Sequence, residues 1–137
     1  MINIFFEDTD EFDLSKLNVE SNIEKLVTNE DRTLGDVNYI LCSDAYLLDI
    51  NRQYLNHDYY TDVISFDYCE DNVISGDIFI SVDTVADNAK EYGVTFEKEL
   101  ARVMIHGVLH FVGYNDKSNE EVPIMRAKEN QYLSLFD

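Results

Sequence analysis

With 137 residues, 45% of them hydrophobic, the chain has the length of about one domain and enough apolar material for a sizeable core. Its 28 acidic and 10 basic residues give a net charge of -18, which opposes non-specific attraction to nucleic-acid backbones and to anionic lipid. We therefore expect a single domain over residues 1–137, and any contact with nucleic acid has to be local.

Two further observations argue against membrane and secreted classes. The first residues, MINIFFEDTDEFD, lack the basic and apolar regions of a signal peptide, and no run of 18 apolar residues follows. Cys42 and Cys69 stand 27 positions apart, without the CxxC spacing of a redox pair or a zinc site. We expect reduced cysteines that act as small hydrophobic residues, and a cytoplasmic protein with no membrane partner.

The first half of the chain predicts two strands, each followed by a helix. The expected elements are a strand at 2–8, a helix at 14–32, a strand at 37–43 and a helix at 44–55. Gly35 breaks the helical pattern before the second strand, and Ser43 or Asp44 can cap the second helix. The residues of that helix expected to face a core are Leu47, Leu48, Ile50 and Tyr54.

The second half predicts a hairpin and then three helices. The expected elements are strands at 61–68 and 75–82, and helices at 84–92, at 96–113 and after Pro123. Asp83 can cap the first of these helices, Gly93 stands where a glycine ends a helix, and Thr95 can cap the second. Glu97 and Glu99 lie in the first turn of the second helix, where the helix dipole favours acidic residues.

The helix over 96–113 is apolar most of the way round, which is typical of a central helix covered on several sides. Its apolar positions are Leu100, Val103, Met104, Ile105, Val108, Leu109, Phe111 and Val112. Together the elements predict the α/β class, with a small mixed sheet of about four strands, this helix at the centre and other helices around it.

Two histidines and an aspartate stand near the end of this helix, in the stretch HGVLHFVGYND (106–116). His106 and His110 are four positions apart, so both imidazoles lie on one helix face and can reach a single ion. Gly113 can take the left-handed conformation that turns the chain back, which places Asp116 as a third ligand. We therefore predict a metal centre formed by these three side chains.

Two imidazoles and one carboxylate, with a fourth position left for water, are typical of catalytic zinc. Alternatively, the two histidines are core residues and Asp116 is a turn residue, but the glycine and the third ligand at this spacing favour metal. The spacing also resembles the zinc helix of metzincin proteases, whose general-base glutamate corresponds to Gly107 here. Peptide hydrolysis by that route therefore lacks its base.

The run HGVLHFVGY (106–114) resembles the signature of the YbeY family of bacterial metal-dependent endoribonucleases. The further stretches that agree are NRQYLNHDYYTDVISF (51–66), SGDIFIS (75–81), and Met125 with Glu129. The resemblance covers residues 47–135. It implies cleavage of single-stranded RNA in ribosomal RNA maturation and ribosome quality control, with ribosomal RNA or ribosomal particles, and not DNA, as partners.

Two departures from the family pattern bear on the site. The third ligand is histidine in most of the family, whereas Asp116 is an oxygen donor that suits zinc but makes the site one unit more negative. The family's arginine in the stretch 51–66 is thought to act on the RNA phosphate, and Leu55 stands in its place. The phosphate-binding group must therefore come from elsewhere or be absent.

Candidates for that group follow from spacing. Arg102 lies one helical turn before the first histidine and can share its face. Alternatively, Arg102 forms a surface ion pair and does not bind phosphate. His57 lies two residues after the missing arginine, and the alternative is an ordinary loop histidine. Lys117 adjoins the third ligand. Asp62 matches the family motif and is expected to support the site, although it can equally cap a turn.

The predicted reaction is metal-assisted cleavage of a phosphodiester, with one divalent ion, expected to be zinc, held by His106, His110 and Asp116. Two other classes stay open. A zinc hydrolase of another substrate, such as a peptidase, is weakened by Gly107, whereas a non-catalytic ribosome-assembly factor with a structural metal fits the acidic charge and the missing arginine. Removal of a structural metal should unfold the protein, but an open catalytic site should lose activity before stability.

Overall fold

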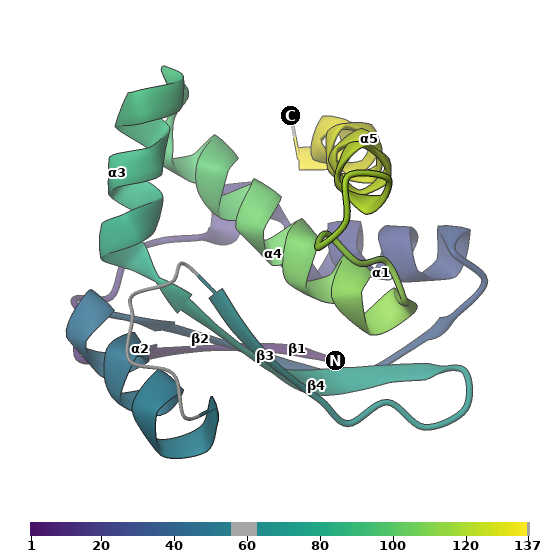
Figure 1. Ribbon diagram of the computed structural model, residues 1–137, viewed down its shortest axis with the longest axis horizontal. Helices are drawn as coiled ribbons and strands as arrows, with labels where there is room; N and C mark the ends of the chain where they lie inside the picture. Colours follow the sequence, from purple (N-terminus) through teal and green to yellow (C-terminus); the bar gives the residue numbers. More distant parts are fainter. Residues whose placement is uncertain (56–62, 137) are drawn as a thin grey trace.

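A four-stranded mixed sheet is the framework of the computed structural model, which describes residues 1–55 and 63–136 (Figure 1). The strands are β1 (Ile2–Glu7), β2 (Thr33–Cys42), β3 (Val63–Asp67) and β4 (Val73–Ser81). Their order across the sheet is β1-β2-β4-β3. Strand β2 runs parallel to β1 and β4, and β3 is antiparallel to β4. The expected mixed sheet and its hairpin are confirmed.

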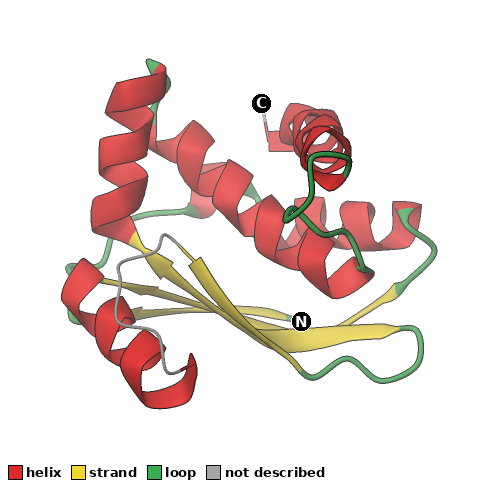
Figure 2. Ribbon diagram, in the orientation of Figure 1, coloured by secondary structure: helices red, strands yellow, loops and turns green. Residues whose placement is uncertain are grey.

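Helices cover both faces of this sheet unequally. They are α1 (Val19–Asn29), α2 (Asp44–Ile50), α3 (Val82–Tyr92), α4 (Phe96–Val112) and α5 (Glu121–Leu133), with short 3-10 turns at Ser15–Leu17 and Ser134–Phe136. Helix α2 lies alone on one side, and the other four lie on the opposite side (Figure 2). Within the described ranges, no helix combines the length and the apolar character needed to cross a membrane.

Helix α4 lies at the centre of the main core, between the sheet and the neighbouring helices (Figure 1). All the apolar side chains of α4 that the sequence analysis names are buried. Gly107 is buried as well, and a Cβ atom there would lie 2.9 Å from the Ile78 side chain of β4. The missing side chain lets α4 approach the sheet closely, so position 107 faces the core.

Serine or threonine side chains cap the N-termini of three helices. Ser43 accepts a hydrogen bond from the Tyr46 backbone N–H at 3.2 Å, and Thr95 accepts one from Lys98 N–H at 3.1 Å, as expected. The expectation that Asp83 caps α3 is wrong. Strand β4 runs directly into α3, so Ser81 is the capping residue. The Asp83 carboxylate instead accepts a hydrogen bond from the Asp44 N–H at 3.0 Å, which joins the starts of α2 and α3.

The other differences from expectation have local causes. The helix expected over 14–32 is interrupted at Asn18, which takes a left-handed conformation with φ +47°. Gly35 does not precede the second strand but lies inside it, next to a register shift between β2 and β4. Tyr54 is 65% exposed and not in a core, because the chain becomes π-helical over Asn51–Leu55 and the helical phase changes.

Pro123 lies within the first turn of α5 and not before it. A proline is tolerated there, because the first N–H groups of a helix have no partner inside the helix. Ser118 and Glu121 exchange hydrogen bonds just before it, at 3.1 Å and 3.0 Å, in the arrangement of a capping box. Both cysteines are free, with Cys42 buried between the sheet and α2 and Cys69 half-buried.

Candidate metal centre

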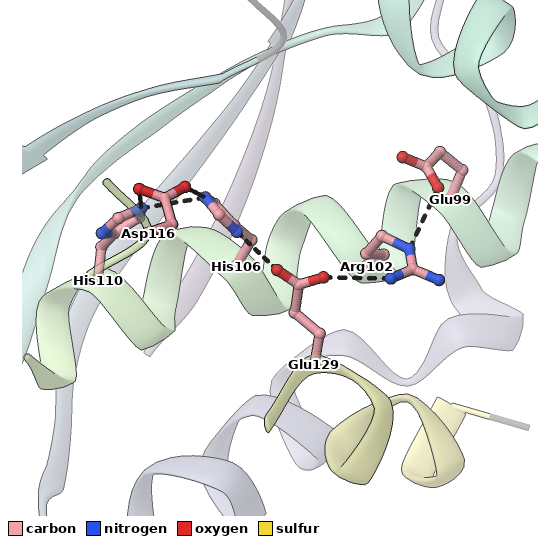
Figure 3. Close-up of polar contacts among 6 residues, drawn as sticks. All are labelled: Glu99, Arg102, His106, His110, Asp116 and Glu129. Atoms are coloured by element: carbon pink, nitrogen blue, oxygen red, sulfur yellow. Dashed lines mark hydrogen bonds and ion pairs between the residues drawn. The ribbon is translucent and has the colours of Figure 1, made fainter. Parts of the chain in front are cut away.

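The carboxyl end of α4 presents two imidazoles and then reverses the chain. His106 and His110 project from successive turns of the same helix face (Figure 3). Gly113 ends the helix with φ +123°, a conformation that residues with a Cβ atom rarely adopt. The segment that follows turns back and brings Asp116 over both histidines, as the spacing predicts (Figure 3).

The three side chains meet at distances that suit a metal ion. The Nε2 atoms of His106 and His110 lie 3.0 Å apart, and the carboxylate oxygens of Asp116 lie 3.2 Å and 3.6 Å from them. Three ligand atoms that are each about 2.1 Å from one ion at tetrahedral angles lie about 3.4 Å apart. The 3.2 Å distance is to Asp116 Oδ2 and the 3.6 Å distance to Asp116 Oδ1, and one donor atom from each side chain lies within 4.8 Å of the other two, so this group can hold a metal ion.

The other ring nitrogen of His106 is held by a carboxylate from α5. His106 Nδ1 lies 2.8 Å from Glu129 Oε2, and the second oxygen of Glu129 lies 3.1 Å from an Arg102 guanidinium nitrogen. Arg102 Nε in turn lies 3.3 Å from Glu99. Figure 3 shows these groups as one chain of contacts that leads from Glu99 to the two histidines. A carboxylate that binds the second nitrogen of a histidine fixes its tautomer and ring orientation, which is typical of metal ligands.

The electrostatics of this chain keep Glu129 ionised and His110 neutral. Burial raises the pKa of Glu129, but hydrogen bonds from His106 and Arg102 outweigh it and leave the pKa below its ordinary value. Burial, followed by the charge on His106, lowers the pKa of His110, whereas Asp116 and the Tyr114 backbone act in the opposite direction with less effect. A neutral imidazole is the form that binds metal.

A pocket of about 150 Å³ opens on the Glu129 side of His106, between α3, α4 and α5. Arg102 and Arg126 line it together with Glu129, and Asn88 of α3 forms part of the opposite wall. Because this pocket borders a candidate metal ligand, it can accept a part of a substrate.

The structure brings together the three metal ligands predicted from the sequence. Arg102 shares their helix face, as expected, but its guanidinium is bound by two glutamates, and a role in binding phosphate stays a prediction. Lys117 is exposed next to Asp116. His57 and Asp62, the other predicted site residues, lie outside the described residues, so their assignments also stay predictions.

Sequence reasoning missed two acidic groups of this site. Glu129 belongs to a stretch that matches the family resemblance, which is the one signal that singled it out, but its contact with His106 spans 23 positions of the chain. Glu99 was expected to act on the helix dipole, yet its side chain is 3% exposed and pairs with Arg102. The available signal was the spacing, because an acidic residue three positions before an arginine on the ligand face can pair with it.

Comparisons with known proteins agree with the fold and extend over nearly the whole chain. A sequence model of the family described as Endoribonuclease YbeY matches residues 4–137. Endoribonuclease YbeY of Flavobacterium johnsoniae is 47% identical and covers 99% of this chain and 97% of its own length. That of Bacteroides thetaiotaomicron is 46% identical over 123 residues, which are 90% of each protein.

Among solved structures, the solution structure of a Thermotoga maritima protein is similar, with a TM-score of 0.69 and 35% sequence identity. The match covers 98% of this chain and 87% of the other. A family match over nearly the full length, together with relatives of this similarity, shows that the protein belongs to the YbeY family of endoribonucleases.

Proposed function

We propose that the protein is a metal-dependent endoribonuclease that cleaves single-stranded RNA, with ribosomal RNA or ribosomal particles in the cytoplasm as its targets. The observation that carries the proposal is the convergence of His106, His110 and Asp116 at the spacing of metal ligands. Their side chains are 20%, 29% and 37% exposed, so a substrate can reach them. Two nitrogens and one oxygen form a ligand set that suits zinc, which we propose as the ion.

The residues around the ligands would prepare the site for this reaction. When bound, a divalent ion supplies Lewis-acid stabilisation of the charge that develops on a phosphoryl group. Glu129 holds the His106 ring so that Nε2 faces the other two ligands, and Arg102 neutralises part of the charge on Glu129. These contacts favour Arg102 as a positioning group.

The neighbouring pocket would accept a part of the RNA that flanks the cleaved bond. Arg126 lies exposed on its α5 wall and makes no hydrogen bond or ion pair with other described residues. A cation in this position can offset the strongly negative charge of the protein where the RNA approaches.

The two alternative functions, a peptidase and an assembly factor with a structural metal, each require a feature that the described residues do not show. A peptidase of the metzincin type needs a glutamate at position 107, but this position packs against Ile78 in the core and not beside the ligands. An assembly factor with a structural metal would be expected to close its site with four protein ligands, whereas the described residues bring three together.

Removal of the metal tests the proposal. Because the core of α4 is formed by apolar packing and not by the ligands, the chelated protein should stop cleaving single-stranded RNA while its melting temperature falls little. Added zinc should restore cleavage. Unfolding on chelation would support the structural-metal alternative, and cleavage by the metal-free protein would contradict the proposal.

The turn at Gly113 offers a further prediction. Alanine at this position should destabilise the protein by about 1 to 3 kcal/mol, because φ +123° is strained for any residue with a Cβ atom, although the space around it is open. We also expect metal affinity to fall several-fold, because relief of this strain moves Asp116. Competition with a chromogenic chelator measures the affinity.

Gly93 provides the matched control. It ends α3 with φ +67°, has equally open surroundings and is not part of the metal centre. Gly93→Ala should therefore lower stability but leave metal affinity unchanged. Equal metal affinity in Gly113→Ala and the wild-type protein would mean that the position of Asp116 does not depend on this turn.

A further inference from the structure

The segment that carries the third ligand is tied to a distant part of the fold. Tyr114, two positions before Asp116, donates a hydrogen bond from its hydroxyl to Glu30 Oε1 at 2.7 Å. Glu30 follows the last residue of α1, 84 positions earlier in the chain. The contact therefore joins the loop of the candidate metal centre to the end of α1.

The Glu30 side chain is itself held in place by residues of α5. Its second oxygen accepts hydrogen bonds from the Tyr132 hydroxyl and, at 3.1 Å, from the Lys128 ammonium group, both on α5. Burial raises the pKa of Glu30, but these hydrogen bonds and the one from Tyr114 outweigh it and hold the pKa below its ordinary value. Glu30 is therefore a charged acceptor at neutral pH, and hydrogen bonds to charged acceptors are the stronger ones.

A second contact from the same end of α1 holds the other side of the turn. The Arg32 guanidinium donates a hydrogen bond to the Val112 carbonyl at 3.2 Å, immediately before Gly113. The turn between Val112 and Tyr114 is thus held on both sides by residues that follow α1. The ring of Tyr114 packs against the main core, whereas Asn115 and Lys117, the neighbours of Asp116, are exposed and add little packing to the loop.

We infer that Tyr114 and Glu30 are positioning residues, whose hydrogen bond holds Asp116 over the two histidines in the arrangement that binds the metal. The inference rests on the proposed metal binding and adds the group that presets the third ligand. A ligand on a short exposed loop loses conformational freedom when it binds, and a loop that is already held loses less. The hydrogen bond between Tyr114 and Glu30 therefore raises metal affinity, although neither residue contacts the ion.

If the hydrogen bonds to Glu30 only stabilised the fold, loss of either tyrosine hydroxyl would affect zinc affinity alike. Tyr132 donates to the same carboxylate of Glu30, and is buried, but it belongs to α5 and not to the loop. Tyr132→Phe removes this hydrogen bond to Glu30 and also the one that the Tyr132 hydroxyl accepts from Asn29 at 2.8 Å, but it keeps the Tyr114 hydroxyl. It is therefore a matched control for Tyr114→Phe.

The experiment measures zinc affinity by competition with a chromogenic chelator, at a temperature well below the melting temperature of every variant. Tyr114→Phe should weaken zinc binding about 10-fold, the low end of the range for residues that orient metal ligands. Tyr132→Phe should lower the melting temperature but keep the wild-type zinc affinity. Equal loss of affinity in both variants, or none in Tyr114→Phe, would overturn the inference.

A double variant tests whether the effect passes through the third ligand. The Asp116→Ala background binds zinc much more weakly, so its affinity is measured at raised zinc concentrations. There Tyr114→Phe should cause no further loss of zinc affinity, because the group that it positions is gone. An additive loss would overturn the inference. If the wild-type protein bound no zinc or other divalent ion, the proposed function would fail and the inference with it, whereas wild-type binding with an unchanged Tyr114→Phe variant contradicts the inference alone.

Discussion

Alanine at position 110 is expected to remove both the bound metal and the RNA-cleaving activity of this protein while its fold stays intact. His110 contributes one of the three donor atoms that meet at the end of α4, and two remaining donors rarely hold a divalent ion. Changes in groups that only orient ligands cost about 10 to 100-fold in metal affinity, so loss of a ligand should cost more than 100-fold. The imidazole is partly exposed and contacts mainly the other ligands, so stability should change little.

Elemental analysis and an RNA cleavage assay on the same preparation measure both effects. Lys98→Ala is a suitable control, because this residue is exposed on the same helix and lies away from the ligands. The control should keep full metal content and activity. A His110→Ala variant that still holds one ion per chain would rule out the assigned ligand set.

Glutamine at position 129 is expected to lower metal affinity and cleavage about 10 to 100-fold, the range typical of groups that orient metal ligands. The Glu129 carboxylate accepts from His106 with one oxygen and from Arg102 with the other. An amide has a single oxygen, so glutamine can satisfy only one of these donors and turns its own NH2 group toward the second. We also expect a loss of about 1 to 3 kcal/mol in the free energy of unfolding.

Glu97→Gln makes the same change in net charge at an exposed position of α4 and should affect neither metal affinity nor cleavage. Metal titrations and denaturant unfolding of both variants give the comparison. If Glu129→Gln bound metal as tightly as Glu97→Gln, the orientation of His106 would not depend on its contact with α5.

Elements and ligands that depend on neighbouring residues could be predicted from the sequence. Thr95 caps α4 through a residue three positions away, and Gly113 ends the helix through its own backbone freedom. The spacing of His106, His110 and Asp116 around that glycine then fixes their meeting point. These are short-range effects, so helical spacing and the glycine turn were sufficient to predict which three side chains meet at the candidate metal centre.

Features that depend on contacts between distant segments could not be predicted. Ser81 and Asp83 are both good capping residues, and the choice between them follows from the direct passage of β4 into α3 and from the contact of Asp83 with α2. The partners of Glu129 and Glu30 are likewise set by packing. Their contacts with His106 and Tyr114 span 23 and 84 positions, and periodicity carries no information at such separations.

Cleavage of a circular single-stranded RNA by the metal-free protein, titrated with zinc, tests most directly whether this protein is a metal-dependent endoribonuclease. A circle has no ends, so only cleavage at an internal bond can convert it to a linear molecule. We expect no linear RNA without metal, its appearance in proportion to the zinc bound, and none with His110→Ala. Linear RNA formed at the same rate by the metal-free protein, or by His110→Ala, would contradict a metal-dependent reaction at this site.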